Sequence, residues 1–286
     1  DPACGSGAFL NEVFDYLYRE GQVVNSELAT LNAGQEQLFR WDTHILANNI
    51  YGVDINQESV EITKLSLWLK TANRNEKLTY LDDNIKCGNS LIDDPAIAGE
   101  LAFKWEKEFA IIMSAGGFDV VVGNPPYGAM LAATDVAWLA KKYKSFEYQA
   151  NTYVLFYDQG IGLLKKSGIL GYITPATFTY QHYFQNIRQI MQALEIRSIC
   201  KYCFAVFEDA DIGDTVSFII QNTPRRNKAA SILICSNKED ASNTHVAISY
   251  DDLIHKDGIY NLSSDGVLDK IYKKSKPLGE YADIVV

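Results

Sequence analysis

The chain has 286 residues, a hydrophobic content of 47% and a formal net charge of −10 at neutral pH. This length and composition indicate a globular protein with a substantial core and exclude an intrinsically disordered one. The sequence also excludes a membrane-spanning protein, because no apolar run approaches the roughly 20 residues that cross a bilayer.

The first half of the chain alternates between segments with helical and strand-like patterns. Asn56 is expected to be a helix N-cap, because apolar residues follow it at helical spacing. A continuous apolar run, 118–123, is typical of a parallel strand buried on both faces. We expect helices at 8–18, at 35–48, from Asn56 to about 72 and at 98–113, strands at 50–54, 85–88 and 118–123, and an irregular excursion at 21–34.

The second half continues the alternation. Residues 128–150 are expected to form a long, partly basic loop with one helical turn. We expect helices at 151–166 and 180–194, and strands at 169–174, 197–207, 215–221 and 229–235. Such alternation predicts an α/β fold with a doubly wound, mostly parallel sheet. The last two strands are close enough in sequence to add an antiparallel pair at its edge.

The pattern weakens after about residue 236. We therefore expect one domain at 1–235 and an appendage, or the lead-in to a further domain, at 236–286. Residue 1 already belongs to a glycine-rich loop of the kind that follows a buried strand. We expect the first strand of the sheet to be missing from the chain, and the chain to be a fragment of a longer polypeptide.

Gly5-Ser6-Gly7 lies where this first strand would turn into the first helix. Glycines there let main-chain amides approach a ligand, and Asp54, at the end of the next strand, can accept hydrogen bonds from both hydroxyls of a ribose. Asn89 and Ser90 follow the third strand and can meet the edge of an adenine. The pattern predicts a nucleoside cofactor. NAD is not favoured, because Leu10 replaces the third glycine of its fingerprint and Asp54 lies much further on than about 20 residues.

Asn124-Pro125-Pro126-Tyr127 directly follows the last apolar strand of the first half. Its prolines remove two amide donors and leave the Asn124 side-chain oxygen and the Pro125 carbonyl as acceptors. An aromatic amine is a poor nucleophile because its lone pair is delocalised, and two acceptors on its N–H groups can turn that lone pair toward an activated methyl group. Tyr127 offers a ring for stacking on a base. Phe178 is a candidate for the other face, with core packing as its alternative.

Together the two motifs predict transfer of a methyl group from S-adenosylmethionine to the exocyclic amine of an adenine that is flipped out of a DNA duplex. The chain resembles the amino-adenine DNA methyltransferases of the gamma arrangement, most closely the methyltransferase part of type IIG restriction–modification enzymes and related phage-defence methyltransferases. The resemblance covers roughly residues 1–222 and is carried by DPACGSGAFL, IYGVDINQESVEITKLSLWL, CGNSLI, FDVVVGNPPYG, GILGYITPATF and VFEDADIGDTVSFII.

The resemblance implies a Rossmann-like class I methyltransferase fold and a bacterial or archaeal cytoplasmic enzyme, with recognition and nuclease domains in the same longer polypeptide. Double-stranded DNA is the implied partner, and because the net charge is negative, much of the DNA clamp is expected in those other domains. The implied catalytic residues are Asn124, Pro125, Pro126 and Tyr127. The implied cofactor-binding residues are Asp1, Pro2, Ala3, Cys4, Gly5, Gly7, Asp54, Ile55, Asn89 and Ser90. Relatives often carry Asp at position 89, where an Asn can still hydrogen-bond the cofactor amine.

Two other functions stay open from the sequence. A glutamine-side-chain methyltransferase uses the same motif on a planar amide, and a lapsed methyltransferase could serve as a DNA-binding or assembly module. The long segment after Tyr127 favours the nucleic-acid enzyme, and the intact Asn124 favours an active one. No metal is expected: Cys200-Lys201-Tyr202-Cys203 lacks the second ligand pair of a zinc site and is better interpreted as strand positions.

Overall fold

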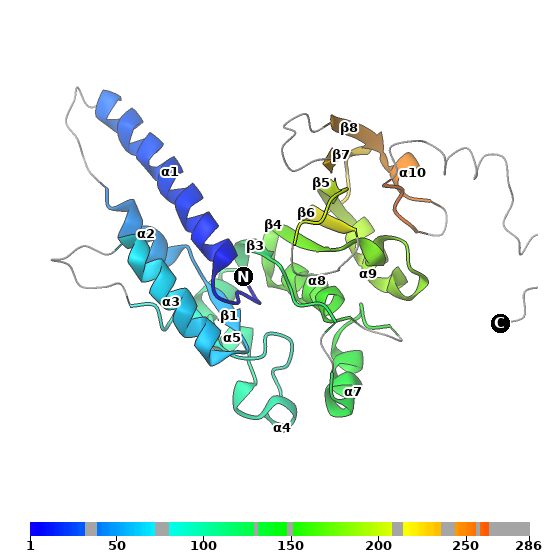
Figure 1. Cartoon of the computed structure of the whole chain (residues 1–286), viewed down its shortest axis with the longest axis horizontal. Coiled ribbons are helices and arrows are strands. Elements are labelled where there is room, and N and C mark those ends of the chain that lie inside the picture. The colour runs from blue at the N-terminus through cyan, green and yellow to red at the C-terminus, as the bar shows by residue number, and fades with distance from the viewer. Residues whose placement is uncertain are drawn as a thin grey trace, which may run out of the picture.

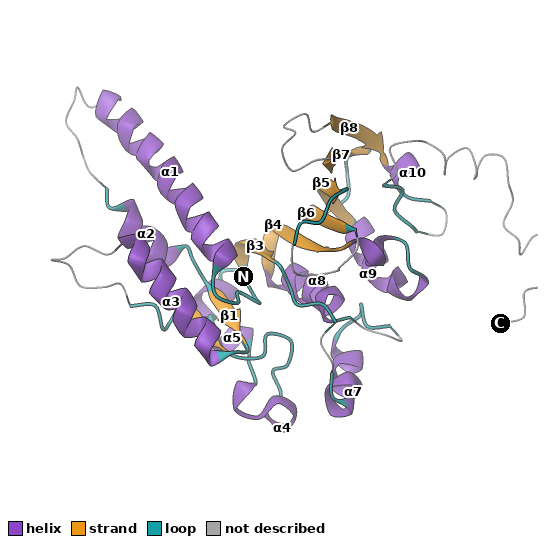
Figure 2. Cartoon of the chain, viewed as in Figure 1, coloured by secondary structure: helices purple, strands orange, loops and turns teal. Residues whose placement is uncertain are grey.

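The computed structural model describes residues 1–31, 39–71, 80–128, 131–147, 151–207, 214–235, 244–255 and 258–262. Its strands form a two-stranded and a six-stranded sheet, and helices pack beside both (Figures 1 and 2). The α/β class predicted from the sequence is confirmed. Within these ranges, no helix is both long and apolar enough to cross a membrane.

The smaller sheet pairs β1 (Gly52–Asp54) with β2 (Ile85–Cys87) in parallel. Three helices lie together beside it, α1 (Ala8–Leu31), α2 (Trp41–Asn48) and α3 (Gln57–Thr71) (Figure 1). The carboxyl ends of β1 and β2 therefore point to the same edge, which is where the predicted cofactor residues follow each strand.

The start of α3 is the predicted one. The side-chain oxygen of Asn56 accepts a hydrogen bond from the Ser59 amide at 3.0 Å, as an N-cap residue does. Apolar side chains from the three helices and the smaller sheet form one core cluster, made of Cys4, Leu10, Phe14, Ile45, Leu46, Ile50, Val60, Leu67, Leu81 and Ile85. This core holds β1 and the loop before α1 in a fixed relation.

The expectation of an irregular excursion at 21–34 is wrong for residues 21–31, which continue α1, while 32–38 lie outside the described residues. Gly21 is buried in the helix, and a Cβ placed on it would lie 2.5 Å from Cγ of Trp41. The glycine is thus required by the close approach of α2 to α1 and does not mark the end of the helix.

The larger sheet has the order β3-β4-β6-β5-β7-β8. Its strands are β3 (Phe118–Gly123), β4 (Leu164–Pro175), β5 (Leu194–Tyr202), β6 (Thr215–Pro224), β7 (Ala229–Cys235) and β8 (Thr244–Ser249). The pairs β3–β4 and β5–β7 are parallel, whereas β6 lies between β4 and β5 and is antiparallel to both.

The edge of this sheet differs from the sequence expectation. The strands β6 and β7 were expected to pair with each other at the edge, and this is wrong, because β6 lies inside the sheet and β7 pairs with β5. The antiparallel edge pair is β7–β8. Since β8 continues the sheet beyond residue 235, the predicted domain boundary at that point stays a prediction.

Helices beside the larger sheet include α7 (Ala133–Lys142), α8 (Thr152–Leu163), α9 (Gln185–Gln192) and the short α10 (Tyr250–Leu253) (Figure 1). α8 is buried along most of its length. α7 is a ten-residue helix where the sequence predicted a loop with one helical turn. The helix expected at 180–194 begins with a separate 3-10 turn, His182–Phe184.

The single helix expected at 98–113 is also wrong. The chain forms instead α4 (Pro95–Ala98), the 3-10 turn Gly99–Leu101, α5 (Trp105–Glu108) and α6 (Ala110–Ser114). Asp94 caps α4 by accepting the Ala96 amide hydrogen bond at 2.9 Å, and Gly99 ends it with φ of +59°. Only glycine adopts that backbone without strain, so the helical pattern is interrupted there.

β3 is not buried on both faces as predicted. Val120 is 53% exposed, and among the described strands β3 pairs only with β4. An open groove of about 570 Å³ separates its other edge from β1. Asp1 lies at this edge: its amino group donates to the Tyr51 carbonyl at 2.9 Å, and its carbonyl accepts from the Val53 amide at 3.0 Å.

Candidate functional site

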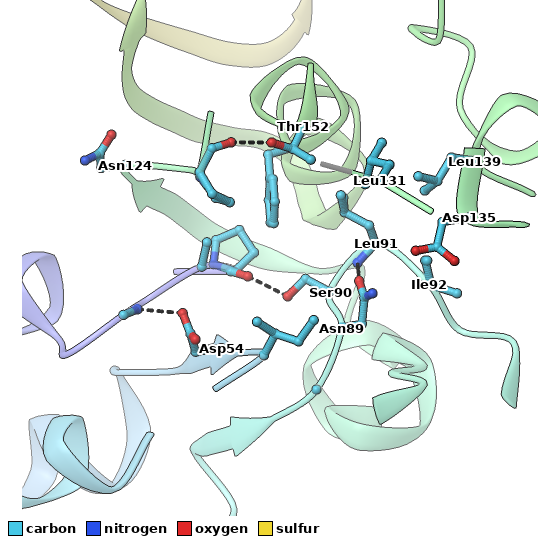
Figure 3. Close-up of a pocket in the computed structure, with 17 residues that line it drawn as sticks. Asp54, Asn89, Ser90, Leu91, Ile92, Asn124, Leu131, Asp135, Leu139 and Thr152 are labelled. Atoms are coloured by element: carbon cyan, nitrogen blue, oxygen red, sulfur yellow. Dashed lines mark hydrogen bonds between the residues drawn. The ribbon is translucent and has the colours of Figure 1, made fainter. Parts of the chain in front are cut away.

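A pocket of about 510 Å³ opens at the carboxyl ends of β1, β2 and β3 (Figure 3). It brings together residues of both predicted motifs, which are Pro2, Ala3, Gly5, Asp54, Ile55, Asn89 and Ser90 from the cofactor set and Asn124 and Pro126 from the catalytic set. The ends of three neighbouring strands thus converge on one cavity, as expected for a ligand site of a doubly wound fold.

The glycine loop is held in place by hydrogen bonds to β1 and α3. The Gly5 amide donates to Oδ2 of Asp54 at 2.8 Å, and the Thr63 hydroxyl donates to the Gly5 carbonyl at 2.8 Å. Gly7 has φ of +87°, and a Cβ placed on it would lie 2.9 Å from Cγ2 of Thr63. Thr63 is a site residue that the sequence patterns did not indicate, because its role depends on contact between α3 and the loop.

Asp54 has a structural role as well as the predicted ligand role. Its Oδ1 accepts the Asn56 amide hydrogen bond at 2.9 Å, while Oδ2 accepts that of Gly5. A carboxylate offers about four lone-pair sites. Two of them are used inside the protein, and the remaining capacity faces the pocket.

Asn89 and Ser90 differ in what they offer to a ligand. The Ser90 hydroxyl is buried and donates to the Pro2 carbonyl, so it fixes the start of the glycine loop and is not a free partner for an adenine edge. Oδ1 of Asn89 accepts the Leu91 amide hydrogen bond at 3.1 Å. Its amide nitrogen has no such partner among the described residues and lies at the pocket.

The beginning of α8 fixes the loop that contains Asn124–Tyr127. The Thr152 hydroxyl donates to the Pro126 carbonyl at 2.6 Å, and Oδ1 of Asn151 accepts the Gly128 amide hydrogen bond at 3.0 Å. Pro125 is buried beneath the loop. The backbone between β3 and residue 128 is therefore held at both prolines, which limits the freedom of the side chain that precedes them.

Asn124 itself presents an acceptor. Its side-chain oxygen is buried and accepts no hydrogen bond from any described residue. Figure 3 places this amide at the same end of the pocket as the Gly5–Asp54 hydrogen bond, with Asp135 at the opposite end. Burial raises the pKa of Tyr127, and interaction with the Asn124 side chain opposes that rise, so the two side chains lie close together.

Several predicted site residues do not line the pocket. Phe178 is a correction: it is 0% exposed and contacts the rings of Tyr153, Tyr157 and Phe218, so it cannot stack on a base in this structure. The remaining residues that do not line it are Asp1, Cys4, Gly7, Pro125 and Tyr127. Burial raises the pKa of the Cys4 thiol to about 11, so this cysteine is not a thiolate at neutral pH.

The far wall of the pocket was not predicted from the sequence. It is apolar apart from one carboxylate, and it is made by Leu131 and by Asp135 and Leu139 of α7, with Ile92 and Phe156 beside them. Helical spacing brings Leu131, Asp135 and Leu139 to one side. Leu139 is fully buried, and this pattern is the signal from which the wall could have been found.

The charges at the pocket are all negative. Asp54 and Asp135 are the charged residues among the described ones that line it, and no Lys, Arg or His lines it. Within the described part of the chain, no group of three or more metal-binding side chains occurs. Cys200 and Cys203, the predicted strand positions, are both free thiols near the end of β5. The pocket is thus suited to a cationic organic ligand and poorly suited to a polyphosphate.

Comparisons with known proteins agree with this arrangement. A family model described as Eco57I restriction-modification methylase matches residues 48–207, which include Asp54 and the segment Asn124–Tyr127. The type II restriction enzyme and methyltransferase RM.Eco57I of Escherichia coli is 34% identical over 201 residues, covering 62% of this chain and 20% of the relative. The chain therefore spans about a fifth of the length of that relative.

Solved structures show the same fold. A modification subunit of a putative type I restriction enzyme from Vibrio vulnificus YJ016 matches with a TM-score of 0.59 at 17% identity, over 85% of this chain and 43% of that one. DrdV, determined as a complex with DNA, matches with a TM-score of 0.58 at 15% identity, over 90% and 27%. Since the family model covers more than half of the sequence, the chain belongs to the Eco57I restriction-modification methylase family.

Proposed function

We propose that this chain transfers the methyl group of S-adenosylmethionine to the exocyclic amine of an adenine in double-stranded DNA, as part of a restriction–modification or phage-defence system. Membership of a restriction-modification methylase family supports methyl transfer. The likeness in fold to a protein determined in complex with DNA is compatible with a DNA substrate.

The observation that carries the proposal is the state of the Asn124 side chain. Buried polar atoms nearly always have a hydrogen-bond partner, and the Asn124 oxygen has none among the described residues although it borders a ligand-sized pocket. A ligand that brings an N–H group would complete this site. The exocyclic amine of adenine has two such groups, and because Thr152 already donates to the Pro126 carbonyl, the Pro125 carbonyl is the natural second acceptor.

The residues at the pocket fit S-adenosylmethionine. Two carboxylates without a neighbouring cation stabilise a ligand that carries a positive sulfonium and an ammonium group. Asp54 retains acceptor capacity for ribose hydroxyls, and Gly5, with φ of +54° and no atom within 4 Å of a Cβ placed on it, leaves room for close approach. When bound, the cofactor supplies a methyl group that is already activated by the charge on sulfur.

The role of the protein in this reaction is alignment. Asn124 would hold one amine N–H, which turns the nitrogen lone pair out of the ring plane, and Tyr127 beside it would present an aromatic face to the base. No general base is required for this step, and the side chains at this end of the pocket include none apart from the hydrogen-bonded Asp54.

The direct test is sequencing of modified bases in DNA from cells that express the intact gene, compared with cells that express its Asn124→Ala variant. We expect N6-methyladenine at one recurring sequence with the wild type and none with the variant. Methylated glutamine in cellular proteins without modified adenine would contradict the proposal in favour of a protein methyltransferase. Unmodified DNA together with no binding of S-adenosylmethionine by the purified protein would contradict it in favour of a lapsed module.

A further inference from the structure

The polarity of Asn89 creates a question that its position alone does not answer. The Leu91 amide is a donor, so the side-chain atom 3.1 Å from it must be the Asn89 oxygen, and the amide nitrogen must face the pocket. An N–H donor suits a ring nitrogen of adenine and cannot accept a hydrogen bond from the exocyclic amine. The expectation that Asn89 binds the cofactor amine is therefore not met by this geometry.

A second carboxylate lies at this end of the pocket. Asp135, in the first turn of α7, is half-buried and lines the same cavity as Asn89 and Ile92 (Figure 3). Its one hydrogen bond among the described residues comes from the adjacent Thr134 hydroxyl at 3.2 Å, so most of its acceptor capacity is unused. Neither a lysine nor an arginine lines the pocket to neutralise it.

The orientation of the cofactor follows from the two ends of the pocket. The methyl group must lie at the end that contains Asn124, and the ribose must lie at Asp54 for its hydroxyls to be bound. Figure 3 shows Asp135 at the end opposite to Asn124, with Asn89 between Asp54 and Asp135. The adenine of the cofactor would therefore extend past Asn89 toward Asp135, between the apolar side chains of α7 and Ile92.

We propose, on the basis of the function proposed above, that Asp135 and Asn89 together read the adenine of the cofactor: Asp135 accepts a hydrogen bond from its exocyclic amine and Asn89 donates one to the neighbouring ring nitrogen. Adenine presents a donor and an acceptor side by side on this edge. Hypoxanthine presents the reverse, an acceptor oxygen and a ring N–H. The acceptor–donor pair of the protein thus matches an adenosyl cofactor and opposes an inosyl one.

The test compares S-adenosylhomocysteine with S-inosylhomocysteine by isothermal titration calorimetry on the intact gene product. We expect the wild type to prefer the adenosyl compound by about 100-fold, because two hydrogen bonds are reversed in the inosyl compound. Asp135→Asn should reduce this preference to about tenfold or less, since a rotated amide can present either its oxygen or its N–H group. Asp135→Ala should reduce it similarly. The exposed Asp83→Asn is the matched control, and it should keep the full preference.

The readout separates this proposal from the proposed function. If S-adenosylhomocysteine binds and the preference is the same within about twofold in the wild type and both Asp135 variants, the reading of adenine by Asp135 is overturned and the cofactor assignment stands. If the wild type, folded by circular dichroism, binds neither compound, the cofactor assignment itself is overturned and this inference falls with it. A general loss of affinity for both compounds in equal measure would also count against Asp135, because a reader must change their ratio.

Discussion

The two sides of the pocket differ in how their polar groups are satisfied. On the glycine-loop side, Gly5, Asp54 and Thr63 are hydrogen-bonded to one another or to neighbouring backbone within the protein. On the opposite side, the Asn124 loop is held through its backbone, while its side-chain oxygen is buried without a partner among the described residues. The comparison teaches that the cofactor side is complete before ligand arrives, whereas the substrate side needs a ligand to complete it.

The largest effect is expected from the incomplete side. Asn124→Ala should lower the rate of methyl transfer by at least about 1000-fold, because it removes an acceptor that acts on the reacting amine. It should leave the melting temperature nearly unchanged, since no internal hydrogen bond is lost. Single-turnover kinetics and thermal unfolding measure the two quantities. A variant that keeps its rate, or one that unfolds several degrees earlier, would remove the distinction between the two sides.

On the complete side, one substitution should affect binding and stability together. Asp54→Ala should weaken cofactor binding by about 1–3 kcal/mol and also lower the free energy of unfolding by about 1–2 kcal/mol, because the Gly5 and Asn56 amides lose their acceptor. Calorimetric titration and urea unfolding give both values. Asp54→Asn, which keeps one oxygen, should lie between the two proteins. Unchanged stability in Asp54→Ala would mean that the carboxylate does not support the loop.

A smaller effect is expected at Thr63, which is buried and does not line the pocket. Thr63→Val keeps its shape but removes the donor to the Gly5 carbonyl, so the free energy of unfolding should fall by about 1 kcal/mol and cofactor affinity by only a few-fold. Thr63→Ser retains the hydroxyl and serves as the control in the same urea titrations. Equal behaviour of Val and Ser variants would show that packing, and not this hydrogen bond, positions the loop.

The smallest effect concerns α8, which holds the Asn124 loop. Burial raises the pKa of Tyr153 to about 12. The folded protein therefore keeps the phenol neutral, while the unfolded chain releases its proton near pH 10. The stability that this group contributes is complete below about pH 10 and is lost as the pH rises toward 12. Tyr153→Phe should reduce the fall in stability between pH 9 and 11, and Tyr16→Phe, at a 54% exposed position, should not. Urea unfolding at both pH values would expose a difference of the opposite sign.

What could be predicted from the sequence is what depends on local chemistry. Asn56 as a helix cap, Gly5 in a tight loop and Asp54 at a strand end all follow from short patterns, and the structure has each of them in that place. The convergence of the glycine loop and Asn124 on one pocket followed from the parallel arrangement of β1 and β2 and from the fold class.

What could not be predicted depends on contacts between distant segments. Phe178 follows a strand in the same way as Tyr127, yet packing against Tyr157 and Phe218 places it in the core. The Ser90 hydroxyl is directed to the Pro2 carbonyl, 88 residues earlier in the chain. No short pattern encodes such pairings, because each partner is chosen by the three-dimensional arrangement of its neighbours.

The absence of cations from the pocket wall has a consequence for how a nucleotide could enter it. Two carboxylates and an apolar wall repel a phosphodiester as firmly as they accept a neutral heterocycle. A nucleotide that is turned out of a helix would therefore insert its base and leave its charged linkages in solvent. The pocket would sort the parts of its substrate by charge, and the grip on the strand would have to come from surfaces outside it.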